Sequence, residues 1–215
     1  MSSYNSCSDG NYQNGKVSID NLKSVLKRGV RFLDFELFSV DDKTVVSVTD
    51  TNDFNYKSAS NELPIHKVLT EVRNNGMYAG TSPNPSDPLF LHFRIKSKIP
   101  RVYNELARAL NSVFGKRLLS NANPGKVKSI KDCETERSKT SAFEGCGKNF
   151  GKVPIDTLRN KVVILVNGDS NIYSGRELHR LTNIVTGTEI TKLEYNYNVE
   201  YETDEKTLIN FNKQN

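Results

Sequence analysis

Residues 29–51, GVRFLDFELFSVDDKTVVSVTDT, constrain the fold of this chain more than any other stretch. Residues 30–38 are apolar and β-prone, residues 41–43 predict a turn, and residues 44–48 form a second β-branched run. The stretch therefore predicts two strands joined by a tight turn.

Two acidic residues, Asp34 and Glu36, interrupt the first of these apolar runs. Residues two apart share a face of a strand, so both carboxylates point the same way. Buried carboxylates need partners, which favours a water-filled or functional end of the strand. An edge strand with a solvated face explains the same pattern, and both interpretations stay open at this point.

Composition indicates a polar, soluble, intracellular protein. The 215 residues are 36% hydrophobic, with a net charge of +5 and a mean hydropathy of −0.57. No apolar run is long enough to cross a bilayer, and MSSYNSCSDG lacks the pattern of a secretory signal. The mild positive charge permits weak contact with anionic lipid but predicts no specific nucleic-acid binding.

The three cysteines, Cys7, Cys133 and Cys146, have no metal-ligand spacing. Their odd number favours reduced thiols in an intracellular setting, and a Cys133–Cys146 bridge across a loop is the alternative.

Four amphipathic helices are expected. Ser18 is an N-cap, and Pro64 and Pro100 open the next two helices. Ser174 and Glu177 have capping-box spacing for the fourth, which Gly187 ends. The predicted buried stripes are Ile19, Leu22, Val25 and Leu26; Ile65, Val68, Leu69 and Val72; Val102, Leu106, Leu110 and Val113; and Leu178, Leu181 and Val185.

Further strands are expected at residues 88–95 and 161–167, with a short one at 117–119. Residues 1–7 could supply a first strand, and residues 190–201 an extended segment. A weak element is expected at 207–214. In PLFLHFRI, residues Phe90, His92 and Arg94 share one face.

Alternating strands and helices predict parallel strands with crossover helices. No Gly-rich phosphate-binding sequence follows any strand, so a TIM-type (β/α) barrel fits better than a doubly wound sheet. A complete barrel takes about 250 residues, and this pattern ends after roughly six strands. We therefore expect a single domain over residues 1–215, incomplete at its C-terminal end, with a long basic loop at residues 121–153.

Several segments resemble the X region of phosphatidylinositol-specific phospholipase C, in its order and spacing. These are SSYNSC, LKRGVRFLDFELF, TVVSVTDT, PLFLHFRI and LRNKVVILVNG, and SGRELHRLTNIVTGTEI continues the likeness more weakly. The resemblance covers residues 2–168 and implies a phosphodiesterase barrel. The chain is also similar to uncharacterised proteins of large DNA viruses.

The family uses two catalytic histidines, one on the transition-state phosphate and one as general acid and base. The resemblance places the first at Tyr4 and the second at Asp50, so this chain lacks both. His66 is expected on the exposed side of a helix start and His179 within a helix. His92 should face the barrel interior, where it is either a packed core residue or a replacement base.

The family's calcium ion is held by an asparagine, two acids and a glutamate. The resemblance places these ligands at Asn5, Asp34, Glu36 and Arg94. A guanidinium cannot share a site with a divalent cation, but it can pair with both acids. We therefore expect Arg94 to replace the metal, so that no cofactor is needed.

Arginine near that position also occurs in the metal-independent bacterial branch of the family, which keeps both histidines. The lysines that grip inositol phosphates correspond to Asn167 and Asp169.

These substitutions favour a catalytically degenerate protein, a pseudoenzyme with a structural or binding role and protein partners in an assembly such as a virus particle. A second hypothesis is an active phosphoric diester hydrolase, with Asp50 as base, Tyr4 as acid, and Arg94 and His92 on the phosphate. In that case Asn5 and Arg94 would bind substrate. A third is a membrane-surface or phosphoinositide binder without turnover, which the basic residues 116–152 favour and Asn167 and Asp169 oppose.

Overall fold

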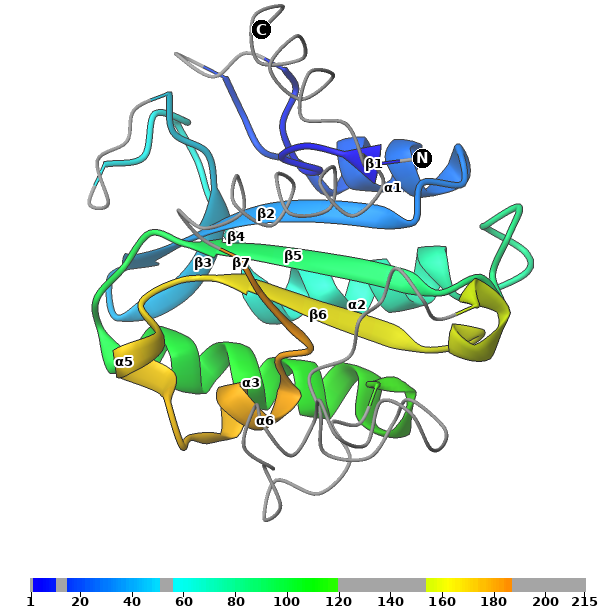
Figure 1. Ribbon diagram of the computed structural model, residues 1–215. Coiled ribbons are helices and arrows are strands. Elements are labelled where there is room, and N and C mark those ends of the chain that lie inside the picture. Colours follow the sequence, from blue (N-terminus) through cyan, green and yellow to red (C-terminus); the bar gives the residue numbers. More distant parts are fainter. Residues whose placement is uncertain (1, 11–14, 51–55, 120–153, 187–215) are drawn as a thin grey trace, which may run out of the picture. The chain divides into compact units, whose positions relative to one another are not determined.

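The computed structural model describes residues 2–10, 15–50, 56–119 and 154–186 (Figure 1). The described elements belong to a compact unit, Met1–Val185, apart from the last residue of the final strand. The segments predicted at 121–153, 190–201 and 207–214, together with Cys133 and Cys146, lie outside these residues. Whether residues 1–215 form a single domain stays a prediction.

Seven strands form one sheet. They are β1 (Ser2–Ser3), β2 (Phe32–Val40), β3 (Lys43–Ser47), β4 (Leu63–Pro64), β5 (Leu89–Ile95), β6 (Val162–Asn167) and β7 (Ile184–Thr186). The order is β4-β3-β2-β5-β6-β7, with β1 beside the first half of β2. Strands β1, β2, β5 and β6 are parallel, as predicted. Strands β3 and β4 are antiparallel to their neighbours because the β2–β3 hairpin turns the chain back at once.

The hairpin turn is tight. Asp41 and Asp42 both have positive φ, 45° and 62°, the conformation in which a two-residue turn follows the twist of its strands. The predicted turn is confirmed, and strand β2 extends to Val40.

The helices are α1 (Ile19–Lys27), α2 (Ile65–Gly76), α3 (Pro100–Phe114), α5 (Ser170–Tyr173) and α6 (Glu177–Leu181). Ser18 caps α1 by accepting a hydrogen bond from the Asn21 amide, as predicted. Helix α1 packs on α2, α2 on α3, and α3 on α6. These helices therefore form a continuous layer.

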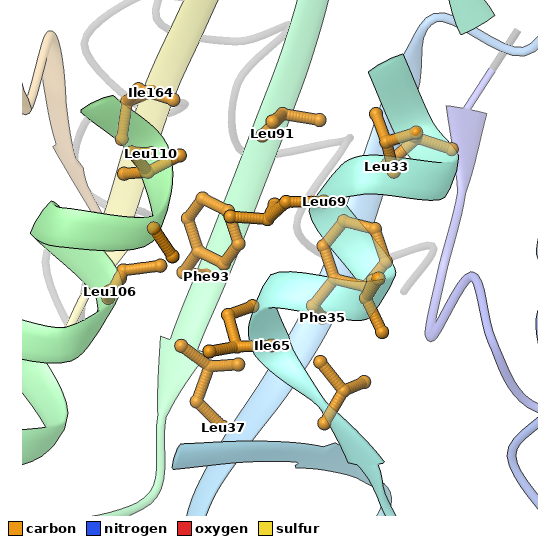
Figure 2. Close-up of a cluster of buried hydrophobic side chains, with 14 of the residues drawn as sticks. Leu33, Phe35, Leu37, Ile65, Leu69, Leu91, Phe93, Leu106, Leu110 and Ile164 are labelled. Atoms are coloured by element: carbon orange, nitrogen blue, oxygen red, sulfur yellow. The ribbon is translucent and has the colours of Figure 1, made fainter. Parts of the chain in front are cut away.

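The hydrophobic core lies between this layer and one face of the sheet (Figure 2). Alternate residues of β2, β5 and β6 meet helices α2 and α3 there, and the predicted stripes of both helices are buried. The labelled members are Leu33, Phe35, Leu37, Ile65, Leu69, Leu91, Phe93, Leu106, Leu110 and Ile164. On the opposite face of the sheet lie Asp34, Glu36, His92 and Arg94, beside a smaller apolar cluster that includes Val163 and Leu165.

The prediction of one helix between Ser174 and Gly187 is wrong. Helix α6 begins at Glu177 after Arg176, with no side-chain cap, and ends at Leu181. Gly175, with φ +70°, separates it from α5. The Asn183 amide donates to the Ile164 carbonyl, and the Asn183 side-chain oxygen accepts from the Ile164 amide. These two bonds hold the chain at the edge of β6, where it continues as strand β7.

Two smaller expectations also change. Pro64 belongs to β4 and precedes α2 instead of lying in its first turn. Gly115–Arg117 forms a 3₁₀ turn, and Leu118 alone bridges to Val162 in place of the short strand expected at 117–119.

The described residues give an α/β sheet of the expected kind, but they do not show the closure of a barrel. The closed barrel therefore stays a prediction. None of the described helices is long and apolar enough to cross a membrane.

Cys7 should be inert in the folded protein. It is buried in the core, and burial raises the pKa of its thiol to about 12. Because the thiolate is the reactive form, we expect no alkylation of Cys7 at pH 7.5 without denaturant and full alkylation in denaturant, measured by peptide mass spectrometry. Labelling of Cys7 in the native protein would contradict the packing described.

Candidate functional site

The candidate site lies toward the carboxyl ends of the parallel strands, on the sheet face opposite the helices. The register places Glu36 of β2, Arg94 of β5 and Asn167 of β6 in one row. The row before it contains Asp34, His92 and Leu165. Ligand sites of parallel α/β folds form at this edge, because the connecting loops converge there.

Arg94 is the centre of the site. Its Nε donates to both Asp34 oxygens, at 3.1 and 3.2 Å, and its Nη2 donates to Asp34 Oδ1 at 2.7 Å. Nη1 donates to Glu36 Oε1 at 2.5 Å, and Nη2 also donates to Asn5 Oδ1 at 2.7 Å. The side chain is 14% exposed. The ion pairs expected between Arg94 and the two acids are therefore present, one of them bidentate.

Both acids have further partners. Asp34 Oδ2 lies 2.7 Å from His92 Nδ1, and Asp34 Oδ1 accepts from the Asn5 backbone N–H at 3.2 Å. Glu36 Oε2 accepts from the Thr49 backbone N–H at 2.8 Å. Each carboxylate is thus held by groups from at least two other segments of the chain.

The two carboxyl groups differ in pKa. Burial opposes ionisation of Asp34, but hydrogen bonds from His92 and Arg94 outweigh it and hold the pKa below its usual value. Burial raises the pKa of Glu36, and Arg94 and the Thr49 N–H offset this only in part. Burial by itself would lower the pKa of Arg94, but Asp34 and Glu36 outweigh it and hold that pKa above its usual value. The cluster therefore favours an ionised Asp34 more strongly than an ionised Glu36.

Tyr4 covers the guanidinium. Its ring centroid lies 4.3 Å from Arg94 Cζ, a cation–π contact, and its side chain is 61% exposed. Asn5 follows with φ +43°, a left-handed conformation uncommon for a residue with a side chain. The strained backbone lets Tyr4 face solvent while the Asn5 side chain is buried.

The other candidate residues lie apart from these contacts. Asp50 is exposed and bonds to the Ser58 hydroxyl. His66 is exposed on α2, and His179 on α6 accepts from the Gly175 amide at 3.1 Å. Asp169 caps the turn into α5 by accepting from the Asn171 amide. The structure thus brings together Tyr4, Asn5, Asp34, Glu36, His92 and Arg94.

Sequence reasoning missed the hydrogen bonds made by backbone amides. The Thr49 amide donates to Glu36, and the Asp34 amide donates to the Ser6 hydroxyl at 3.0 Å. Both bonds depend on the register between distant segments. The stacking of Tyr4 on Arg94 was also missed. Its only sequence signal was the adjacency of Tyr4 to Asn5.

The resemblance implies calcium at Asn5, Asp34, Glu36 and position 94. The oxygens that a hard cation requires are present. However, guanidinium nitrogens lie 2.5–3.2 Å from them, and a divalent cation would meet strong repulsion there. As arranged, these residues fit a guanidinium and do not fit a calcium ion.

Comparison with solved structures supports the fold. PLC21 of L. pealei matches with TM-score 0.52 and 20% identity, over 76% of this chain and 17% of that chain. PLC21 of S. officinalis matches with TM-score 0.58 and 18% identity, over 85% and 22%. A calcium-dependent phosphatidylinositol-specific phospholipase C from Streptomyces antibioticus has TM-score 0.48 and 13% identity, over 81% and 54%.

The two PLC21 likenesses show a phospholipase C-like fold. The chain spans about a fifth of the length of the two PLC21 chains. No family model matches the sequence, and no curated protein matches it.

Proposed function

We propose that this chain is a phospholipase C-like domain that does not hydrolyse phosphatidylinositol and serves a structural or binding role. The observation that carries the proposal is the position of Arg94. Its guanidinium is hydrogen-bonded to Asp34, Glu36 and Asn5 at the place where the resemblance implies a catalytic metal. A protein built this way requires no calcium.

The surroundings of Arg94 support the same proposal. The two positions that correspond to the family's histidines are Tyr4, which stacks on Arg94, and Asp50, which bonds to Ser58. On β6, the residue in register with His92 is Leu165, an apolar side chain that cannot donate a hydrogen bond to a phosphate. The donors that a phosphodiester would need are thus already bonded within the protein or absent from these positions.

One contact favours the competing hypothesis of an active phosphoric diester hydrolase. His92 Nδ1 lies 2.7 Å from Asp34, and a carboxylate in that position can orient an imidazole for proton transfer. In such an enzyme the general base would be His92 or, as the sequence suggests, Asp50. Arg94 would have to leave its carboxylate partners in order to bind the substrate.

An assay on phosphatidylinositol vesicles separates the hypotheses. We expect no release of inositol phosphate above the no-enzyme rate, with 1 mM calcium or with chelator, while an active phospholipase C run in parallel releases product (~1 mM is a free calcium level at which weak oxygen-ligand sites fill). Turnover that falls on His92→Gln or Asp50→Asn would refute the proposal and support the hydrolase.

Co-sedimentation with the same vesicles tests the kind of role. Binding without turnover favours a membrane-surface or phosphoinositide binder. Absence of binding favours a structural role with protein partners, such as a place in a virus particle.

A further inference from the structure

Four basic side chains lie together at the amino end of β6, the end of the sheet opposite the candidate site. They are Lys116, Arg117, Arg159 and Lys161. Their two segments are held side by side, because Leu118 bridges to Val162, the first residue of β6, and the Leu119 amide donates to the Val162 carbonyl at 2.8 Å. The Lys161 ammonium donates to the Lys116 carbonyl at 3.2 Å. We call these four side chains the basic surface; in Figure 1 it lies at the end of β6 away from α5.

The basic surface has an excess of positive charge. Among the described residues, no acid forms an ion pair with Lys116, Arg117 or Lys161. Arg159 has one acidic partner, Asp156, at 3.9 Å, and the two side chains are 59% and 85% exposed. An ion pair this exposed contributes little. Since like charges held together repel one another, an anionic partner would relieve the repulsion.

An exposed apolar side chain lies next to the basic surface in the chain. Ile155 begins the 3₁₀ turn Ile155–Leu158 and is 62% exposed, whereas Leu158 is buried. The Lys161 amide donates to the Leu158 carbonyl at 3.0 Å, so this turn is joined directly to the basic segment. A single exposed isoleucine is ordinary on a protein surface. Beside basic groups, however, it gives the combination found in proteins that lie on membranes, an apolar side chain for the acyl boundary and cations for anionic headgroups.

This combination favours a membrane over a nucleic acid. A phosphate backbone would pair with the basic groups but would leave Ile155 in water. The interface of an anionic bilayer provides a partner for both kinds of side chain. Each lysine or arginine near such a surface strengthens binding by about fivefold.

We propose that the basic surface and Ile155 bind anionic membranes, at the end of the sheet opposite the candidate site. The inference rests on the proposed function in one respect, because it names the partner of a binding role. It does not depend on what Arg94 replaces.

Co-sedimentation of the full chain with lipid vesicles is the test. We expect binding to vesicles of phosphatidylcholine with about 30% phosphatidylserine, an anionic surface, and none to phosphatidylcholine alone. Raising the salt from about 0.1 M to about 0.5 M should weaken the binding, because salt screens exposed charges. Phosphatidylserine contains no inositol, so this measurement is separate from turnover on phosphatidylinositol.

Three variants test the surface itself. Lys116→Gln with Arg117→Gln, and Arg159→Gln with Lys161→Gln, should each weaken vesicle binding by about 25-fold, since each pair removes two charges worth about fivefold apiece. Ile155→Ser should weaken it by about tenfold, because an apolar side chain is no longer buried on binding.

Lys98→Gln with Arg101→Gln is the matched control. It makes the same change in net charge, but both residues follow β5, at the carboxyl end of the sheet. We expect its affinity to stay within about twofold of the wild type, because charges farther than a Debye length from the membrane are screened. Thermal unfolding of each variant checks that the fold is retained.

Three outcomes would overturn the proposal. The first is that the wild type does not bind the phosphatidylserine vesicles. The second is that the Lys98 and Arg101 control loses as much affinity as the variants of the basic surface, or that those variants bind like the wild type. The third is binding to double-stranded DNA, lost in the same variants, without binding to vesicles. Turnover on phosphatidylinositol would refute the proposed function and leave the phosphatidylserine result standing.

Discussion

Replacing Arg94 with leucine is expected to lower the free energy of unfolding by about 3–5 kcal/mol, the usual cost of removing one partner from a buried ion pair. Leucine retains much of the apolar stem but leaves Asp34 and Glu36 without their cation. It also removes the hydrogen bond to Asn5 Oδ1 and the contact with the Tyr4 ring. Urea unfolding of the two proteins at pH 7 measures the difference.

Arg101→Leu is the matched control. Arg101 also bonds to an aspartate at 2.7 Å, but the side chains of Arg101 and Asp42 are 38% and 88% exposed. Exposed pairs contribute about 0–1 kcal/mol. Equal losses for Arg94→Leu and Arg101→Leu, or an unchanged stability of Arg94→Leu, would show that Arg94 is not an internal counterion.

The helix layer and the sheet of this fold could be predicted because each depends on the repeat of apolar residues along a short stretch of sequence. Alternation in the sequence places Asp34 and Glu36 on one face of β2, and His92 and Arg94 on one face of β5. Helices α2 and α3 bury the stripes that their 3.6-residue period indicates. Because these two strands carry opposite charges on the same face, the sequence also predicts the pairing of Arg94 with Asp34 and Glu36.

The parts that could not be predicted depend on contacts between distant segments. The stretch after α5 has an apolar stripe of helical period, yet Val185 lies in β7 and is 51% exposed. The side chain of Asn183 determines this outcome by pairing with the backbone of Ile164. Nothing in the local sequence shows that an asparagine there will meet the edge of a strand 19 residues earlier.

The same distinction applies inside the site. The acids and Arg94 follow from strand period and register, whereas the Thr49 amide on Glu36 and the Asn5 amide on Asp34 require the tertiary structure. These backbone donors matter because they make the two carboxylates unequal. Asp34 contacts two charged or ionisable side chains, Arg94 and His92. Glu36 contacts one nitrogen of Arg94 and a neutral backbone amide.

This inequality predicts different costs for neutralising the two acids. Asp34→Asn should destabilise the protein by about 3–5 kcal/mol at pH 7, because it removes the carboxylate that pairs bidentately with Arg94. Glu36→Gln should cost about 1–3 kcal/mol, since the remaining Asp34–Arg94 pair is balanced in charge and Gln can still accept one hydrogen bond. Denaturant unfolding of the three proteins at pH 7 gives both values.

The pH dependence should have opposite signs for the two variants. The lowered pKa of Asp34 means that its contribution is present above its unfolded pKa of about 3.9 and is lost as pH falls through the folded pKa. The cost of Asp34→Asn therefore shrinks in acid. The raised pKa of Glu36 means that its contribution is full below its unfolded pKa of about 4.3 and is lost as pH rises through the folded pKa. The cost of Glu36→Gln therefore shrinks toward neutral pH.

Unfolding free energies measured from pH 3 to pH 8, which spans roughly one unit below the unfolded pKa values of Asp and Glu to well above them, test this directly. Parallel pH profiles for the two variants would contradict the inequality, because they would mean that Arg94 neutralises both acids alike. Opposite slopes would show that Arg94 is primarily the counterion of Asp34. Glu36 would then be a carboxylate whose ionisation is opposed by burial more than it is favoured by Arg94.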